Sequence, residues 1–121
     1  MQPEFSQSAP IYVQLMDISK RNIIRGEWRA GEKMPPVRDL AVKFGVNPNT
    51  VQRALSELER EGLVYSERTA GRFITKDVGA ITALKDKTAK EYIQNFLGHM
   101  KQLGFNKEQL IKLIKEEDYN E

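Results

Sequence analysis

The stretch VRDLAVKFGVNPNTVQRALSELEREG, residues 37–62, contains two helical patterns joined by a tight turn. In the first pattern, apolar side chains recur at the spacing i, i+3, i+4 and i+7, which is typical of the buried stripe of a helix. These side chains are Val37, Leu40, Ala41 and Phe44. Gly45 follows at once, and glycine is common just past a helix end because it adopts the left-handed conformation without strain. We therefore predict a short helix that ends at Gly45.

The second pattern begins with residues that suit a helix start. Asn47 is expected to cap the helix with its side-chain oxygen, and Pro48 occupies the first helical position, where a missing N–H has no consequence. Gly62 ends the helix. Its inward face consists of Val51, Ala54, Leu55 and Leu58. Two helices joined by about three residues are typical of a helix-turn-helix.

Two short β-prone runs follow Gly62. They are LVYSE and GRFIT, and the residues between them are Arg68, Thr69 and Ala70. Such an arrangement predicts a β-hairpin. A hairpin directly after a helix-turn-helix forms a wing, so we predict a winged helix-turn-helix domain over residues 8–77. The predicted fold class is mainly α with a small β-hairpin.

A further helix is expected before this motif. Ser8 and Pro10 suit its start, and Gly26 suits its end. Apolar residues fall near one face, and we expect Ser19 to interrupt this apolar stripe. The residues of the stripe are Tyr12, Leu15, Met16 and Ile23.

The C-terminal part reads as two helices, and we assign residues 80–117 to a helical tail. Residues 76–87 are expected to be a linker that grades into a long helix over residues 84–103. Asn106 with Gln109 three positions later matches a capping box for a second helix. Large apolar side chains cover a wide face of these two helices, and each contributes roughly 1.5–3 kcal/mol when buried. The two helices alone cannot bury this face. This face must therefore pack on the winged helix, on a second chain, or on both.

The start of the second helix of the helix-turn-helix carries polar groups suited to DNA. In such motifs this helix enters the major groove with its N-terminal end first. Asn and Gln pair with adenine, Thr bonds a phosphate or touches a thymine methyl, and Arg suits guanine or phosphate. The candidate residues here are Asn47, Asn49, Thr50, Gln52 and Arg53. Plainer interpretations stay open: Asn47 as a cap only, Arg53 as an ion-pair partner of Glu57, and Thr50 and Gln52 as solvated residues.

The charge distribution favours a polyanionic partner for the N-terminal part. The chain has a formal net charge of +2, and all eight arginines lie within residues 1–79. Arginine makes forked contacts with phosphate and guanine. Arg38 is expected to clamp a backbone phosphate, and Arg68 and Arg72 of the hairpin are expected to follow a neighbouring phosphate or the minor groove.

Several motifs together resemble the GntR family of bacterial transcription regulators. These are PIYVQ, GEKMPPVRDLA, GVNPNTVQRA and LEREGL, and the tail segment LGFNKEQLIKLIKE is similar to the YtrA-like branch. The resemblance covers residues 8–117. It implies homodimeric DNA-binding proteins, mostly repressors, that bind near-palindromic operators.

The resemblance also implies residue roles. Arg38, the start of the recognition helix and the wing tip from Thr69 to Gly71 are implied to contact DNA. The tail resembles a dimerisation module, for which we select Tyr92, Ile93, Phe96, Leu97, Met100, Leu110, Leu113 and Ile114. Two motifs depart from those of the branch, which usually read LPSVR and RGxGTFV. Pro36 stands where a serine is usual, and the wing reads RTAGRFI.

Other classes of function find little support in the sequence. His99 is the single histidine, there is no cysteine, and no glycine-rich phosphate loop is present, so we expect no enzyme, metal or cofactor. No secretion signal and no membrane span are visible, so a cytoplasmic protein is the default. The alternative function is a protein-interaction module whose tail binds a partner. A small-molecule effector of unknown identity stays open, although residues 80–121 are too short to enclose a typical pocket of ~300 Å³.

Overall fold

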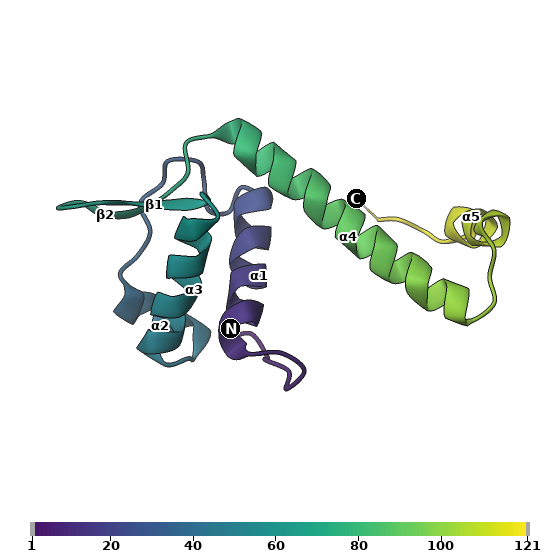
Figure 1. The fold of residues 1–121 in the computed structure, drawn as a ribbon, viewed down its shortest axis with the longest axis horizontal. Coiled ribbons are helices and arrows are strands. Elements are labelled where there is room, and N and C mark those ends of the chain that lie inside the picture. Colours follow the sequence, from purple (N-terminus) through teal and green to yellow (C-terminus); the bar gives the residue numbers. More distant parts are fainter. Residues whose placement is uncertain (1, 121) are drawn as a thin grey trace. The chain divides into compact units, whose positions relative to one another are not determined.

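Five α-helices and one two-stranded hairpin make up residues 2–120, the part of the chain described by the computed structural model (Figure 1). Chain contacts divide it into two units, residues 1–85 and 86–121. The fold class predicted from the sequence is confirmed. The elements in chain order are α1 (Ile11–Ile24), α2 (Val37–Phe44), α3 (Pro48–Arg60), β1 (Val64–Glu67), β2 (Gly71–Ile74), α4 (Val78–Gln102) and α5 (Lys107–Glu116).

The turn between α2 and α3 forms as its residues predict. Gly45 has φ +69° and ψ +38°, the left-handed conformation that a side chain would strain. The side chain of Asn47 then accepts a hydrogen bond from the backbone N–H of Asn49 at 2.8 Å, and Pro48 begins α3. These local contacts fix where α3 starts.

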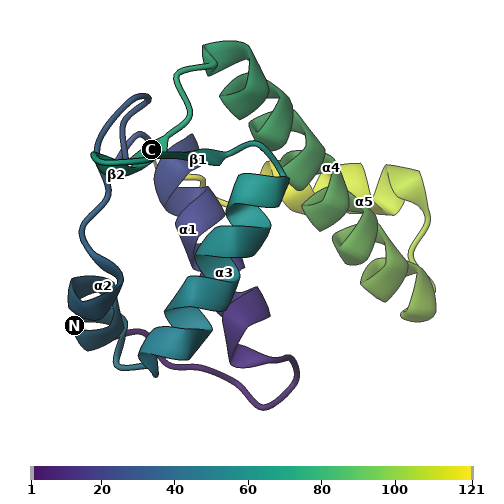
Figure 2. The same ribbon diagram turned by 60° about the vertical axis from the view of Figure 1, so that its left-hand side comes forward.

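The core of the first unit surrounds α3. Its apolar face is almost completely buried, and both α1 and α2 pack against α3. Figures 1 and 2 show α1 and α3 side by side, with α2 near the N-terminal end of α3. The buried residues from these three helices are Leu15, Met16, Ile23, Leu40, Ala41, Phe44, Val51, Ala54, Leu55 and Leu58.

The helix α1 differs from its prediction in two ways. It begins at Ile11, directly after Pro10, so Ser8 lies outside it. Ser19 does not interrupt the buried face but belongs to it, with 1% exposure. Its Oγ donates a hydrogen bond to the Leu15 carbonyl at 2.8 Å. A serine hydroxyl satisfied by its own helix can be buried at little cost, so the polar residue is tolerated in the core.

The hairpin is antiparallel, and residues 32–34 of the loop between α1 and α2 pair with the free edge of β2. Tyr65 faces Phe73 in the register, and their rings stack with centroids 5.5 Å apart. The N–H of Met34 donates to the carbonyl of Arg72 at 2.8 Å, and the N–H of Ile74 donates to that of Glu32 at 2.9 Å. The loop between α1 and α2 is therefore tied to β2.

The expected linker at residues 76–87 is largely helical, which corrects the prediction. The carboxylate of Asp77 accepts a hydrogen bond from the N–H of Ala80 at 3.1 Å, and α4 begins at Val78. Ile81 and Leu84 pack against the core of the first unit. Because these early residues have partners in the core, the helix starts before the apolar pattern of the tail begins.

The second unit contains the rest of α4 and all of α5. The capping box is confirmed: Asn106 accepts from the N–H of Gln109, and the Gln109 side chain accepts from the N–H of Asn106. Leu110 is buried within the single chain, whereas most other large apolar side chains of this unit are exposed. An open groove of about 470 Å³ is lined by residues that include Phe96, Met100 and Leu113.

Candidate nucleic-acid interface

The first turns of α3 present polar side chains on the side away from the core. Asn47, Asn49 and Gln52 are exposed and Thr50 is half-buried, while Val51 between them is buried. The N-terminal N–H groups of a helix are also free to meet an anion, apart from those that a cap occupies. This end of α3 therefore combines amide side chains with the positive end of a helix dipole.

Arg53 has a partner that sequence reasoning missed. Its guanidinium lies over the ring of Tyr12 in α1, with Cζ 3.8 Å from the ring centroid. The ion pair between Arg53 and Glu57 that the spacing allowed does not form, because Glu57 pairs with Arg60 instead. Arg53 remains exposed. A stacked guanidinium keeps its charge and its donors, so Arg53 is positioned by α1 without being neutralised.

Arg72 of the wing reaches α3. Its Nη1 donates a hydrogen bond to Oε1 of Gln52 at 3.2 Å, and its Nε lies 3.8 Å from a carboxylate oxygen of Glu59. The same carboxylate oxygen accepts from Oγ of Ser66 at 2.6 Å. Two residues predicted separately as DNA contacts are therefore bonded to each other.

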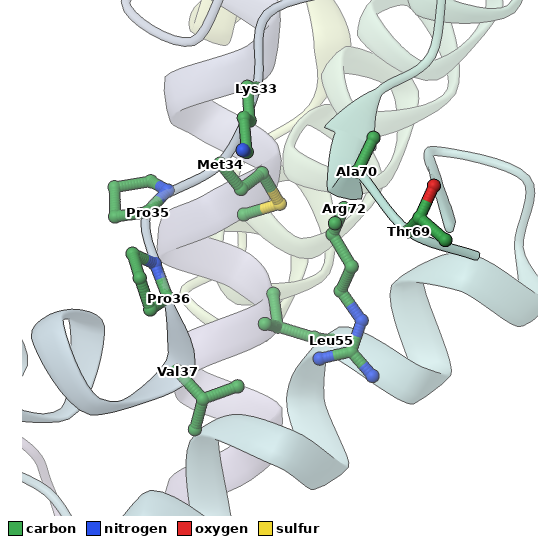
Figure 3. Close-up of a pocket in the computed structure, with 10 residues that line it drawn as sticks. Lys33, Met34, Pro35, Pro36, Val37, Leu55, Thr69, Ala70 and Arg72 are labelled. Atoms are coloured by element: carbon green, nitrogen blue, oxygen red, sulfur yellow. The ribbon is translucent and has the colours of Figure 1, made fainter. Parts of the chain in front are cut away.

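A groove opens between the wing and the loop that precedes α2 (Figure 3). Its volume is about 480 Å³. Met34 to Val37 form one wall, Leu55 of α3 lies at the base, and the wing residues Thr69 to Arg72 form the other wall. The predicted wing residues thus lie across an apolar groove from the start of α2, the helix that carries Arg38.

The remaining predicted cations are exposed. Arg38 lies in the first turn of α2 and Arg68 in the hairpin loop, and neither forms an ion pair within residues 2–120. Gly71 has φ +107°, and a Cβ there would lie 3.3 Å from Cε of Lys33. The wing therefore needs glycine at this position. Nothing in the sequence points to Lys33, because only the folded loop brings it beside the wing.

The described part of the chain contains neither a cluster of metal-binding side chains nor a membrane-spanning helix. Within residues 2–120, His, Cys, Asp and Glu side chains form no group of three that could hold a metal ion. No helix in the same range has both the length and the apolar character needed to cross a membrane.

Comparison with known proteins identifies the family to which this arrangement belongs. Residues 11–74, from the start of α1 to the end of the wing, match the family described as "Bacterial regulatory proteins, gntR family". The chain belongs to the GntR family. Transcription regulators make up this family, so the prediction of a regulator rather than an enzyme is confirmed.

Relatives of similar length extend the match through the tail. The GntR-family protein described here is 41% identical to the uncharacterized HTH-type transcriptional regulator YhcF of Bacillus subtilis, over 95% of each chain. It is 35% identical to the HTH-type transcriptional repressor YtrA of the same organism, over 90% of this chain and 85% of that one. The predicted resemblance to the YtrA-like branch is confirmed.

Solved structures agree with this assignment. A GntR family transcriptional regulator from Listeria monocytogenes matches with a TM-score of 0.88 and 39% identity, over 94% of this chain and all of that chain. The DNA-binding domain of AraR, solved in complex with operator ORX1, matches with a TM-score of 0.54 and 29% identity. That match covers 62% of this chain and 92% of the AraR chain.

Proposed function

We propose that this GntR-family regulator is a homodimeric repressor that binds a near-palindromic DNA operator. The observation that carries the proposal is the exposed, amide-bearing N-terminal end of α3, opposite the buried face of the same helix. In a helix-turn-helix this end enters the major groove, where amide side chains read base edges. The operator complex of the AraR DNA-binding domain, a structural relative, supports the same use here.

The base-reading role falls to the first two turns of α3. Asn49 and Gln52 are exposed and can reach base edges, and Thr50 is placed to contact a phosphate or a thymine methyl. Asn47 keeps its capping role, and its neighbouring N–H groups are suited to a phosphate. Arg53, held over Tyr12, offers its guanidinium to the DNA backbone.

Phosphate contacts are assigned to groups on either side of the groove. Arg38 is exposed at the start of α2, and Arg68 and Thr69 are exposed in the wing loop. Gly71 lets the wing backbone approach the duplex closely, because it has no side chain. Arg72 belongs to this interface through its bond to Gln52. The phosphate contacts of Arg38, Arg68, Thr69 and Gly71 would position the protein on DNA without carrying sequence information themselves.

The homodimer is inferred from the uncovered apolar face of the second unit. Six of the eight selected tail residues are exposed large apolar side chains, namely Tyr92, Ile93, Phe96, Leu97, Leu113 and Ile114. An apolar patch of this kind on a folded domain marks an interaction site. A second copy of the same chain covers such a patch by twofold symmetry, which is the commonest form of oligomer. Leu110, buried in the single chain, is reassigned to the interior of the unit, and Met100 is half-buried.

The sign of regulation is proposed from relatives. YtrA is named a transcriptional repressor, and its similarity extends over the DNA-binding domain and the tail. A repressor needs only to occupy its operator, which a DNA-binding domain joined to a dimerising tail can do. The small-molecule effector that the sequence left open stays a prediction.

Selection of bound fragments from random DNA duplexes tests the proposal. We expect two inverted half-sites whose centres are about 34 Å, or a multiple of that, apart along the duplex. The logarithm of the DNA-binding constant should fall linearly with the logarithm of the salt concentration, with a slope of roughly −0.9 for each phosphate contacted. Asn49→Ala should change base preference, whereas Arg38→Ala should weaken binding to all sequences alike.

Two outcomes would contradict the proposal. If the protein selects no duplex even at low ionic strength, the alternative of a protein-interaction module takes its place. If Asn49→Ala and Gln52→Ala leave both affinity and base preference unchanged, α3 is not the reading helix. Arg25→Ala is the matched control for Arg38→Ala. Arg25 is also an exposed arginine, but it lies at the C-terminal end of α1, away from the proposed interface.

A further inference from the structure

The side chain of Arg72 connects the wing to the helix that reads DNA. It extends from β2 past Leu55 toward α3 (Figure 3). Only 21% of this side chain is exposed, and it lies between Oε1 of Gln52 and the carboxylate of Glu59. Glu59 is held in turn by the hydroxyl of Ser66 on β1. The guanidinium is therefore held by two side chains of α3, and one of these, Glu59, is bonded in turn to the wing.

The chemistry of the guanidinium fixes how the amide of Gln52 is turned. Arginine has five N–H donors and no acceptor, so Gln52 must present its oxygen to Arg72. The amide nitrogen Nε2 and its two hydrogens then point away from Arg72. Gln52 is exposed, so these two donors are accessible to an approaching duplex.

We propose that Arg72 is a positioning residue that sets the base preference of Gln52. A glutamine free to turn reads adenine with its oxygen and nitrogen together, accepting from N6 and donating to N7. Arg72 takes one of the two lone pairs of Oε1 and places its guanidinium beside this oxygen, which disfavours a second donor such as adenine N6 there, so Gln52 offers its donors to the base. Guanine presents two acceptors, N7 and O6, on its major-groove edge, whereas adenine presents one acceptor and one donor. The arrangement therefore favours guanine over adenine at the base that faces Gln52. This inference rests on the proposed function.

The test compares the DNA preferences of the unaltered protein and four variants by selection from random duplexes. Gln52→Ala first locates the base pair whose preference depends on Gln52. Arg72→Met removes the donors but keeps a long side chain over Leu55. Arg68→Met is the matched control, because it also removes one positive charge from the wing but has no bond to α3. The fourth variant is the double variant of Gln52→Ala and Arg72→Met.

We expect guanine at the located position in the unaltered protein. Arg72→Met should lower the guanine-to-adenine ratio by about tenfold, within the range of one specific side chain–base contact. Arg68→Met should weaken binding to all sequences and leave this ratio unchanged. In the Gln52→Ala background, Arg72→Met should no longer affect the ratio, because the residue acts through Gln52.

Other results would overturn the inference. They are an unchanged ratio in Arg72→Met, an equal change in the presence and absence of Gln52, or adenine as the preferred base of the unaltered protein. Each of these leaves the proposed function intact, since a motif is still selected. If the unaltered protein selects no motif, both proposals fail together.

A second variant keeps the inference testable if Arg72→Met does not fold. Glu59→Gln removes the carboxylate charge that holds Arg72, while the wing and Gln52 are unaltered. The guanine-to-adenine ratio should then fall in the same direction as expected for Arg72→Met. Thermal melting of each variant separates a change in preference from a loss of fold.

Discussion

Replacing Ile93 and Phe96 together with alanine should weaken the proposed homodimer strongly while leaving the single chain folded. In the single chain these side chains are 55% and 41% exposed. Together they expose about as much as one fully exposed large apolar side chain. Burying one such side chain contributes roughly 1.5–3 kcal/mol, and the twofold interface contains the pair twice, so the loss is roughly 3–6 kcal/mol. The dissociation constant should then rise by about 10² to 10⁴-fold.

Sedimentation velocity over a wide concentration range measures this change. The unaltered protein should shift from monomer to dimer at far lower concentration than the double variant. Val42→Ala is the matched control, because Val42 is a 72% exposed apolar residue in α2, outside the tail. Its dissociation constant should equal that of the unaltered protein. Circular dichroism should show the same helix content in all three proteins.

The reasoning is refuted if the double variant dimerises as tightly as the unaltered protein while remaining folded. A different outcome, in which the unaltered protein stays monomeric at every concentration, would assign the apolar face to another partner. That result would favour the protein-interaction alternative for the tail.

Three further predictions concern the stability of the first unit, measured by urea or thermal unfolding. Asn47→Ala should lower the free energy of unfolding by about 1 kcal/mol, because the capping hydrogen bond to the N–H of Asn49 is lost. Asn47→Asp should leave the free energy of unfolding unchanged, because aspartate caps a helix as well as asparagine does. Leu58→Ala should cost about 2–5 kcal/mol, since the side chain is fully buried; a loss near zero would contradict the core assignment. Tyr12→Leu should cost about 0.5–1 kcal/mol by removing the ring under Arg53, and equal stability of Tyr12→Leu and Tyr12→Phe would refute that contact.

Much of the fold could be predicted from the sequence because its signals are local. Gly45 ends α2, Asn47 caps α3, and Asn106 with Gln109 starts α5, each through contacts within a few residues. Spacing along the chain is enough to predict such contacts. Two expectations failed for different reasons. Ser19 bonds to its own helix and is therefore tolerated in the core, whereas residues 78–87 are helical because Ile81 and Leu84 have partners in the core of the first unit.

The sequence by itself determined which residue types stand at the exposed start of α3 and in the wing, and this is enough to indicate a DNA-binding surface. Only the tertiary structure decided their partners. Arg53 pairs with the ring of Tyr12 rather than with Glu57, and Arg72 bonds to Gln52, twenty positions away. The physical reason is that long, flexible side chains take whichever partner the packing of distant elements brings within hydrogen-bonding or stacking distance. Spacing along one helix specifies only the neighbours on that helix.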